Sequence, residues 1–224
     1  MQGFAVAGPV LSTLCRHRAA VRLGEAAFGP GHIGEALLDQ VVAAFTAFAD
    51  AFARVGIAAP AVTAVATSAM RAATNRAELV GRVRAATGIE LTVIHGDHEA
   101  ALLADAVRSA LDLADRRGLL LDLGGGSVEV VVAAPDATRG ASFELGALRL
   151  LAGAAPHEHG LAFLAALERQ VAAEGAAIRH HVGDACDVLV AVGGSLQRIA
   201  EHLATPAAEG RPAVIPLPQL EAWT

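Results

Sequence analysis

The chain has 224 residues, of which 54% are hydrophobic, and a formal net charge of −6. This length corresponds to one large domain or two small ones. All 17 basic residues are arginine, which excludes chemistry that needs a lysine, such as Schiff bases and Walker-type phosphate loops. The acidic balance excludes broad nucleic-acid binding, which needs a basic surface.

Two further sequence features concern the compartment. The cysteines, Cys15 and Cys186, have neither a CxxC nor a Cys/His ligand spacing, so we expect no disulfide framework and no zinc site. The apolar start, residues 3–14, lacks the flanks of a secretion signal and is shorter than the roughly 20 residues of a membrane span. We therefore predict a soluble, cytoplasmic protein without a membrane partner.

The first half of the chain alternates between strand and helix patterns. Residues 34–55 and 69–87 have helical spacing, and Gly56 and Gly88 follow them as stop signals. Residues 61–67 and 90–94 are short runs of strand type. Residues 98–111, rich in Ala and Leu, are predicted as a third helix.

The second half begins with an apolar run, residues 118–126, which ends in three glycines. Residues 127–134 form the next strand, so the glycines belong to a β-hairpin, and residues 141–145 add a third strand. The remaining predictions are a helix over 161–180, a buried strand over 187–192, a helix over 195–203 and a Pro-rich tail over 205–224. The pattern predicts two α/β lobes, residues 1–114 and 115–224.

The segment Asp122-Leu-Gly-Gly-Gly-Ser-Val-Glu129 carries the clearest chemical signal. Consecutive glycines let backbone amides approach a phosphate, and Asp122 at the strand end is placed to hold a divalent cation, through water if it is Mg²⁺. Glu129 shares a strand face with Ser127. The alternative is a glycine-rich turn with an ordinary surface glutamate.

Three weaker signals accompany it. Gly193-Gly194-Ser195 leaves a buried strand and opens a helix, which suits an anion but also a plain turn with a serine cap. Arg71, in the first turn of a helix, can fork onto a phosphate or be a surface arginine. Glu99 begins a helix after a strand, where the helix dipole alone would favour an acid.

Taken in order, these segments resemble the exopolyphosphatase/guanosine pentaphosphate phosphohydrolase (Ppx/GppA) family of the actin-like ATPase superfamily. The matching stretches are Val65–Arg71 with Asn75, Thr87–Ile89, Val93–Ala100, Leu121–Glu129, Leu145–Arg149 and Val192–Ser195, with Arg22–Gly24 before the first long helix. The resemblance spans roughly residues 20 to 204. It implies a two-lobed actin-like (ribonuclease H-like) α/β fold with an interlobe cleft.

The resemblance also implies roles for individual residues. Glu99 matches the glutamate that activates the attacking water, and Glu129 the second acid, which positions water or metal. Asp122 matches the aspartate on the Mg²⁺ side, and Arg71 the arginine that faces the terminal phosphate. The phosphate-binding positions are Gly124, Gly125, Gly126 and Ser127 in the first glycine loop and Gly193, Gly194 and Ser195 in the second.

The implied activity is hydrolysis of a terminal phosphoanhydride, with Mg²⁺ as cofactor and polyphosphate or a phosphorylated guanine nucleotide as substrate. The resemblance leaves a homodimer open. This sequence departs from the family in its opening loop, since residues 6–10 lack the Asp-x-Gly-Thr/Ser-Asn-Ser pattern, and the usual last strand and helix of the second lobe are not found. Two alternatives therefore stay open: a binding or regulatory protein without turnover, and an actin-like sugar or acetate kinase.

Overall fold

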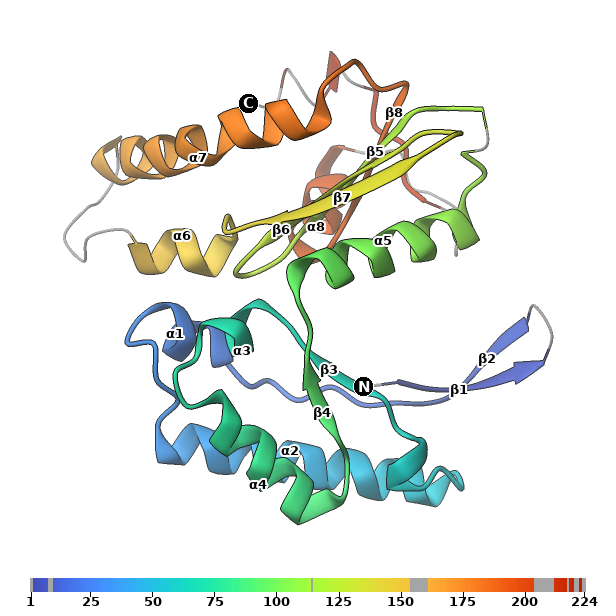
Figure 1. The fold of residues 1–224 in the computed structure, drawn as a ribbon, viewed down its shortest axis with the longest axis vertical. Helices are drawn as coiled ribbons and strands as arrows, with labels where there is room; N and C mark the ends of the chain where they lie inside the picture. Colours follow the sequence, from blue (N-terminus) through green and yellow to red (C-terminus); the bar gives the residue numbers. More distant parts are fainter. Residues whose placement is uncertain are drawn as a thin grey trace. The chain divides into compact units, whose positions relative to one another are not determined.

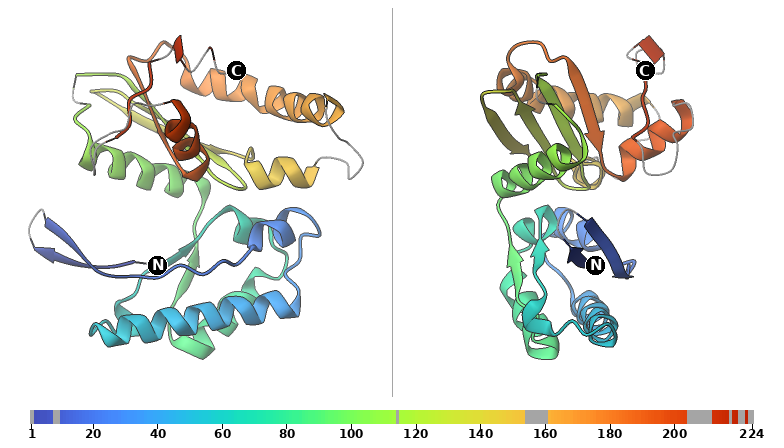
Figure 2. Two further views of the ribbon diagram at one scale, coloured as in Figure 1. Left: turned by 180° about the vertical axis from the view of Figure 1, so that it is seen from behind. Right: turned by 90° about the vertical axis from the view of Figure 1, so that its right-hand side faces the viewer.

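The computed structural model describes residues 2–7, 10–113, 115–153, 161–203, 212–216, 218–219 and 222. The chain folds into two compact units, Met1–His95 and Gly96–Thr224, which are traced in Figures 1 and 2. Cys15 and Cys186 are both free thiols.

The first unit contains two separate two-stranded sheets and four α-helices among its described residues. Its elements in chain order are β1 (Gln2–Ala7), β2 (Val10–Arg16), α1 (Leu23–Phe28), α2 (Glu35–Arg54), the 3-10 helix η1 (Ala59–Ala61), β3 (Ala64–Ala66), α3 (Ser68–Ala72), α4 (Arg76–Thr87) and β4 (Leu91–Val93). Strands β1 and β2 form an antiparallel hairpin in which Ala7 faces Val10. Strands β3 and β4 pair in parallel.

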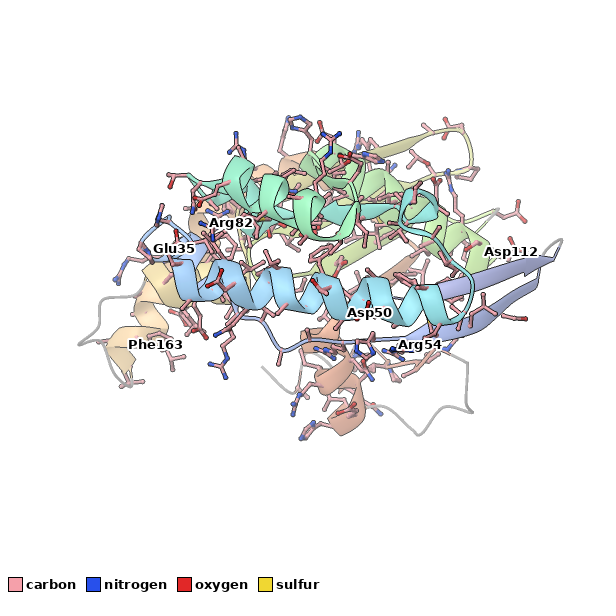
Figure 3. All side chains as sticks on the ribbon, turned by 90° about the horizontal axis from the view of Figure 1, so that it is seen from below. Glu35, Asp50, Arg54, Arg82, Asp112 and Phe163 are labelled. Atoms are coloured by element: carbon pink, nitrogen blue, oxygen red, sulfur yellow. The ribbon has the colours of Figure 1, made fainter. Side chains whose placement is uncertain are left out.

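Helix α2 packs with α4 to make the core of this unit. Leu38, Val41, Phe48 and Phe52 are buried along α2, as the helical spacing predicts, and Leu79 and Val83 are buried along α4. Glu35 at the start of α2 lies beside Arg82 of α4 (Figure 3). Of the described helices, α2 is long and apolar enough to cross a membrane, a weak indication because core helices pass the same test.

The sequence predicts one helix over residues 69–87, and the structure breaks it into α3 and α4. The break lies at residues 73–75, where Ala73 leaves the helix with extended backbone angles. Asn75 lies outside both helices, and its side chain forms hydrogen bonds with the backbone of Ile33. A contact between segments far apart in sequence therefore overrides the local helical periodicity.

The second unit is a four-stranded sheet with helices on both faces. Its elements are α5 (Gly96–Ala110), β5 (Gly118–Leu123), β6 (Val128–Ala133), β7 (Thr138–Phe143), α6 (Ala147–Gly153), α7 (Leu161–Val182), β8 (Val188–Val192) and α8 (Gly194–Leu203). The strand order is β7-β6-β5-β8, with β8 parallel to β5 and the other pairs antiparallel. Residues 212–216 of the predicted tail form no helix or strand.

The central strand β6 is buried at every position because α5 and α7 contact it from opposite faces. Ala100 and Leu103 of α5 pack on Leu120 and Val131 in the sheet. Helix α5 therefore belongs to the second unit, and the chain divides at His95 and Gly96. The sequence prediction placed residues 98–111 in the first lobe, because nothing local in this helix says which sheet its apolar face covers.

Candidate functional site

Three polar side chains form a row across neighbouring strands of the second unit. Asp122 of β5 is the cross-strand partner of Glu129 of β6, and Glu129 is the partner of Ser142 of β7. Directly opposite residues in an antiparallel pair project to the same face. This face is the one that α5 covers, since Leu120 and Val131, two residues further along the same strands, pack on that helix.

Glu129 is a buried carboxylate, only 2% exposed. Burial raises the pKa of Glu129, while hydrogen bonds from Ser142 and Ser127 oppose this rise and the nearby charges of Glu99 and Asp122 add to it. The hydroxyl of Ser142 donates to Glu129 Oε1 at 2.7 Å. The alternative of an ordinary surface glutamate is thereby excluded.

Asp122 lies at the end of β5 and is half-buried. Desolvation raises the pKa of Asp122, and the charge of Glu99 raises it further. Glu99 stands in the first turn of α5 and is partly buried. The three acids that the sequence singled out, on two strands and one helix, are thus close enough to interact electrostatically. Their mutual repulsion favours any cation or proton that enters this space.

The glycine loop between β5 and β6 is held by α6. Gly124 O accepts from Ala147 N at 3.2 Å, and Gly125 O accepts from Leu148 N at 2.7 Å. Gly126 O accepts from Arg149 Nε at 2.7 Å. The first backbone amides of α6 and one guanidinium therefore fix all three glycine carbonyls.

Gly146, just before α6, makes this contact possible. A Cβ on Gly146 would lie 2.4 Å from Gly126 N and 2.5 Å from the carbonyl carbon of Gly125. No side chain fits there, so a glycine is required by close backbone approach. The pattern Leu145–Arg149 was visible in the sequence, but its packing partner was not.

The four loop residues do not share one environment. Gly124 and Gly125 line a pocket, whereas Gly126 and Ser127 are buried. The amide of Gly124 already donates to Ser127 O at 3.0 Å within the hairpin. The exposed amide position of the loop is therefore Gly125, and the hydroxyl of Ser127 serves Glu129.

The pocket measures about 630 Å³ and combines both glycine motifs. Its lining residues are Asp122, Leu123, Gly124, Gly125, Ala147, Leu148, Gly193, Gly194 and Arg198. Gly193 has φ +101°, and a Cβ there would lie 2.8 Å from Asp122 Oδ1, so this glycine brings the second motif against the carboxylate. Gly194 begins α8; the side chain of Ser195 lies outside the described part of the structure.

Arg198 is the cation that lines this pocket. It lies on α8, is exposed, and its guanidinium makes no hydrogen bond or ion pair with another residue of the described part of the chain. Sequence reasoning missed it, because a single arginine on a short helix carries no motif. It also missed Ser142, which lies between the segments Leu121–Glu129 and Leu145–Arg149 that carry the family resemblance.

Arg71 lies on α3 in the first unit. Its Nη1 donates to Ile94 O at 3.1 Å, and its own carbonyl accepts from Arg76 Nη1 at 3.0 Å. The arginine is therefore held in a defined position on α3 rather than being a free surface side chain.

The described residues contain no group of three His, Cys, Asp or Glu side chains placed to hold a metal ion by themselves. Mg²⁺ does not need such a cage, because it keeps several waters and uses one or two carboxylates with substrate phosphates. Asp122 and Glu129 supply carboxylate oxygens, and their pKa values are raised mainly by burial and further by neighbouring acids, so a cation beside them would favour their ionised forms. The donor set fits Mg²⁺ bound mainly through water.

Comparison with known proteins places these features in a family. Residues 4–208 match the model of the Ppx/GppA phosphatase family. The protein named exopolyphosphatase 1 of Mycobacterium bovis is 37% identical over 115 residues, which is 50% of this chain and 32% of that relative. The protein of the same name from Mycobacterium leprae is 36% identical over 113 residues, 50% of this chain and 33% of the relative. Each match thus spans about a third of the relative's length.

Solved structures show the same fold. A crystal structure of an exopolyphosphatase from Cytophaga hutchinsonii superposes with a TM-score of 0.81 at 24% identity, covering 90% of this chain and 65% of the other. The Ppx/GppA family member of Aquifex aeolicus gives a TM-score of 0.78 at 20% identity, covering 99% and 72%. The expected actin-like α/β fold is confirmed, and the chain belongs to the Ppx/GppA phosphatase family.

Proposed function

We propose that the protein hydrolyses the terminal phosphoanhydride bond of polyphosphate or of a phosphorylated guanine nucleotide. The observation that carries this proposal is the meeting of Glu99, Asp122 and Glu129 beside a glycine-lined pocket in a chain of this family. Carboxylates of this kind activate water, and no lysine or covalent nucleophile is required.

In the reaction, Glu99 accepts a proton from a water molecule as the water oxygen attacks the terminal phosphorus. The bond from phosphorus to the bridging oxygen breaks, and that oxygen leaves with the electron pair on the shortened chain. Glu129, fixed by two serine hydroxyls, orients the water. The amide of Gly125 and the guanidinium of Arg198, which both line the pocket of the second unit, hold phosphate oxygens.

Mg²⁺ would be held by Asp122 and Glu129 and would supply positive charge to the phosphate oxygens. The pKa values of both acids are raised, so ionising them costs free energy that a bound cation offsets. The protein's own contribution to catalysis is to orient the attacking water and to keep bulk solvent away from Glu129.

Phosphate release tests the proposal. Polyphosphate and guanosine pentaphosphate are each incubated with the protein, with and without Mg²⁺, and inorganic phosphate is measured. We expect release that requires Mg²⁺ and falls at least a hundredfold in Glu99→Gln. Glu168→Gln, an exposed acid on α7, is the matched control and keeps the parent rate. Equal rates in Glu99→Gln and the control contradict the role of Glu99.

A second function has one observation in its favour. The strands β1 and β2 contain no acidic residue and no asparagine, although the family opens with a loop that carries both. A protein of this fold that binds phosphate without turnover would fit. Calorimetry with tripolyphosphate separates the two, since binding without phosphate release favours this alternative.

A further inference from the structure

Ser142 lies at the end of the row of cross-strand partners Asp122, Glu129 and Ser142. Its hydroxyl donates to Glu129 Oε1 at 2.7 Å, and its Cα is paired with that of Glu129 across β6 and β7. Glu129 is almost fully buried, so few water molecules can replace a lost donor. A hydrogen bond to a buried carboxylate lowers the energy of the charged group and fixes the direction of the carboxylate oxygens.

The same residue also seats the helix that carries Glu99. A Cβ on Gly96 would lie 2.3 Å from Ser142 Cβ and 2.7 Å from Ser142 Oγ, so the first residue of α5 rests directly on this serine. Gly140, two residues earlier on β7, also approaches α5 closely, since a Cβ there would lie 2.8 Å from Ala100 Cβ. Strand β7 is thus the surface that sets the position of α5.

Glu99 lies three residues after Gly96, within the first turn of α5. A shift of Gly96 therefore moves Glu99 by a similar amount, because one helical turn is rigid. Glu129 and Glu99 interact electrostatically. Ser142 contacts Glu129 directly, and it also contacts Gly96 at the start of the helix that carries Glu99.

We infer that Ser142 is a positioning residue: its hydroxyl orients the carboxylate of Glu129, and its Cβ sets the distance of Glu99 by seating Gly96. The inference rests on the proposed function for its kinetic part only. It assigns no substrate contact to Ser142, which acts through the two acids.

Three variants separate the two contacts. Ser142→Ala removes the hydroxyl and keeps the Cβ that seats Gly96. Gly96→Ala keeps the hydroxyl and forces α5 away from β7. The double variant Gly96→Ala/Ser142→Gly restores the space for the new methyl group and lacks the hydroxyl. Ser109→Ala, an exposed serine later on α5 that bonds its own helix, is the control.

The expected kinetics follow from these contacts. In Ser142→Ala, kcat of phosphate release falls about tenfold or more, since a hydrogen bond to a charged group is lost, while KM stays close to that of the parent. Tm falls modestly, because the buried Glu129 carboxylate loses one of its two serine donors. Gly96→Ala loses both activity and thermal stability. The double variant has a higher Tm than Gly96→Ala but keeps the low kcat of Ser142→Ala. Ser109→Ala behaves as the parent.

Crystal structures of the parent and of Ser142→Ala supply a readout without turnover. Rotation of the Glu129 carboxylate away from its parent position in Ser142→Ala supports the inference. An unmoved carboxylate overturns it, whether or not the parent releases phosphate, and so does a Ser142→Ala variant with the parent kcat. Absence of phosphate release by the parent contradicts the proposed function alone, and the crystallographic comparison then decides the role of Ser142.

Discussion

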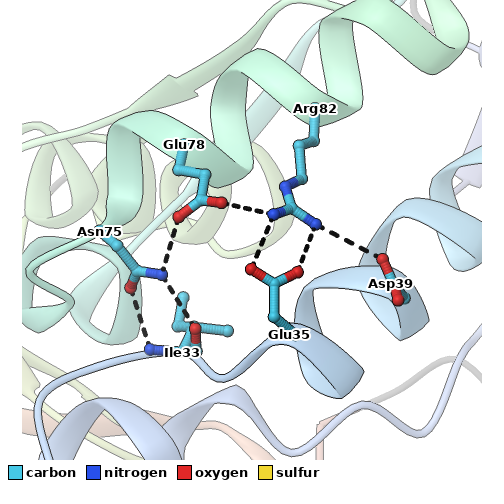
Figure 4. A network of polar contacts seen from close by, with 6 residues as sticks. All are labelled: Ile33, Glu35, Asp39, Asn75, Glu78 and Arg82. Carbon is cyan, nitrogen blue, oxygen red and sulfur yellow. Dashed lines mark hydrogen bonds and ion pairs between the residues drawn. The ribbon is translucent and has the colours of Figure 1, made fainter.

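The side-chain amide of Asn75 bonds to both polar atoms of the Ile33 backbone. Ile33 N donates to Asn75 Oδ1 at 2.9 Å, and Asn75 Nδ2 donates to Ile33 O at 2.9 Å (Figure 4). Ile33 itself is fully buried. This pair of bonds joins the start of α2 to the start of α4.

Replacing Asn75 by Ala should destabilise the protein by about 1–3 kcal/mol, because the Ile33 peptide would lose both partners in a partly buried place. Urea unfolding followed by circular dichroism measures the change. Thr46→Ala, which removes an exposed hydroxyl bonded within α2, serves as control and should change stability far less. A loss no larger than that of the control would show that water replaces the amide.

Arg82 joins three acids at the surface of the first unit, Glu35, Asp39 and Glu78 (Figure 4). The hydrogen bond from Arg82 lowers the pKa of Glu78 from its ordinary value of 4.5. The stability from this pair is therefore present above pH 4.5 and is lost as the pH falls through the lower folded value. Arg82→Ala should lower Tm modestly at pH 7, and the difference from the parent should shrink in acid and in 1 M salt.

The buried acid Glu129 should have the opposite effect on stability. Its folded pKa is raised, so its favourable contribution exists at low pH and is lost as the pH rises through the folded value. In metal-free buffer we expect Glu129→Gln to raise Tm at pH 8 relative to the parent and to leave it nearly unchanged at pH 4. The same variant should lose phosphate release. A Tm below that of the parent at pH 8 would contradict the raised pKa.

Gly146→Ala should disrupt the glycine loop. Its methyl would collide with the backbone of Gly125 and Gly126, and backbone atoms cannot step aside as a flexible side chain can. We expect a loss of several degrees in Tm and of tripolyphosphate binding measured by calorimetry. Gly81→Ala is the matched control: nothing lies within 4 Å of that position inside α4, so alanine should stabilise by about 0.5–1 kcal/mol.

Arg198→Ala should weaken substrate binding without changing the chemical step. Arg198 is the positively charged side chain in the pocket lining and can attract phosphate, whereas the negative charge of Asp122 in the same lining repels it. We expect KM to rise about tenfold with kcat nearly unchanged, since the lost contact is made equally in the ground state and the transition state. Arg169→Ala, an exposed arginine on α7, should leave both constants unchanged. A fall in kcat alone would place Arg198 at the reacting phosphate.

The sequence was informative wherever a pattern is local. Helix α2, the glycine hairpin and strand β8 lie where periodicity and glycine placement predict them. The sequence also places Asp122 and Glu129 on the two strands of one hairpin, and the structure then pairs them directly across it.

Contacts between distant segments were beyond the sequence. The break before α4 depends on Ile33, 42 residues before Asn75. The seat of α5 depends on Ser142, and the place of Arg198 in the pocket depends on how α8 follows β8. Each of these needs tertiary packing that no local periodicity encodes.

The parallel pairing of β8 with β5 has a consequence for the order of folding. Strands β5, β6 and β7 are joined by short turns, so their meander can form as soon as residues 118–143 are available. Strand β8 pairs with β5 from about 70 residues further along, where Arg117 N donates to Asp187 Oδ2. The pocket residues that follow β8 therefore join the sheet after the meander has formed; they are Gly193, Gly194 and Arg198. During synthesis, the cross-strand pairs of Asp122, Glu129 and Ser142 can thus form before the phosphate pocket is complete.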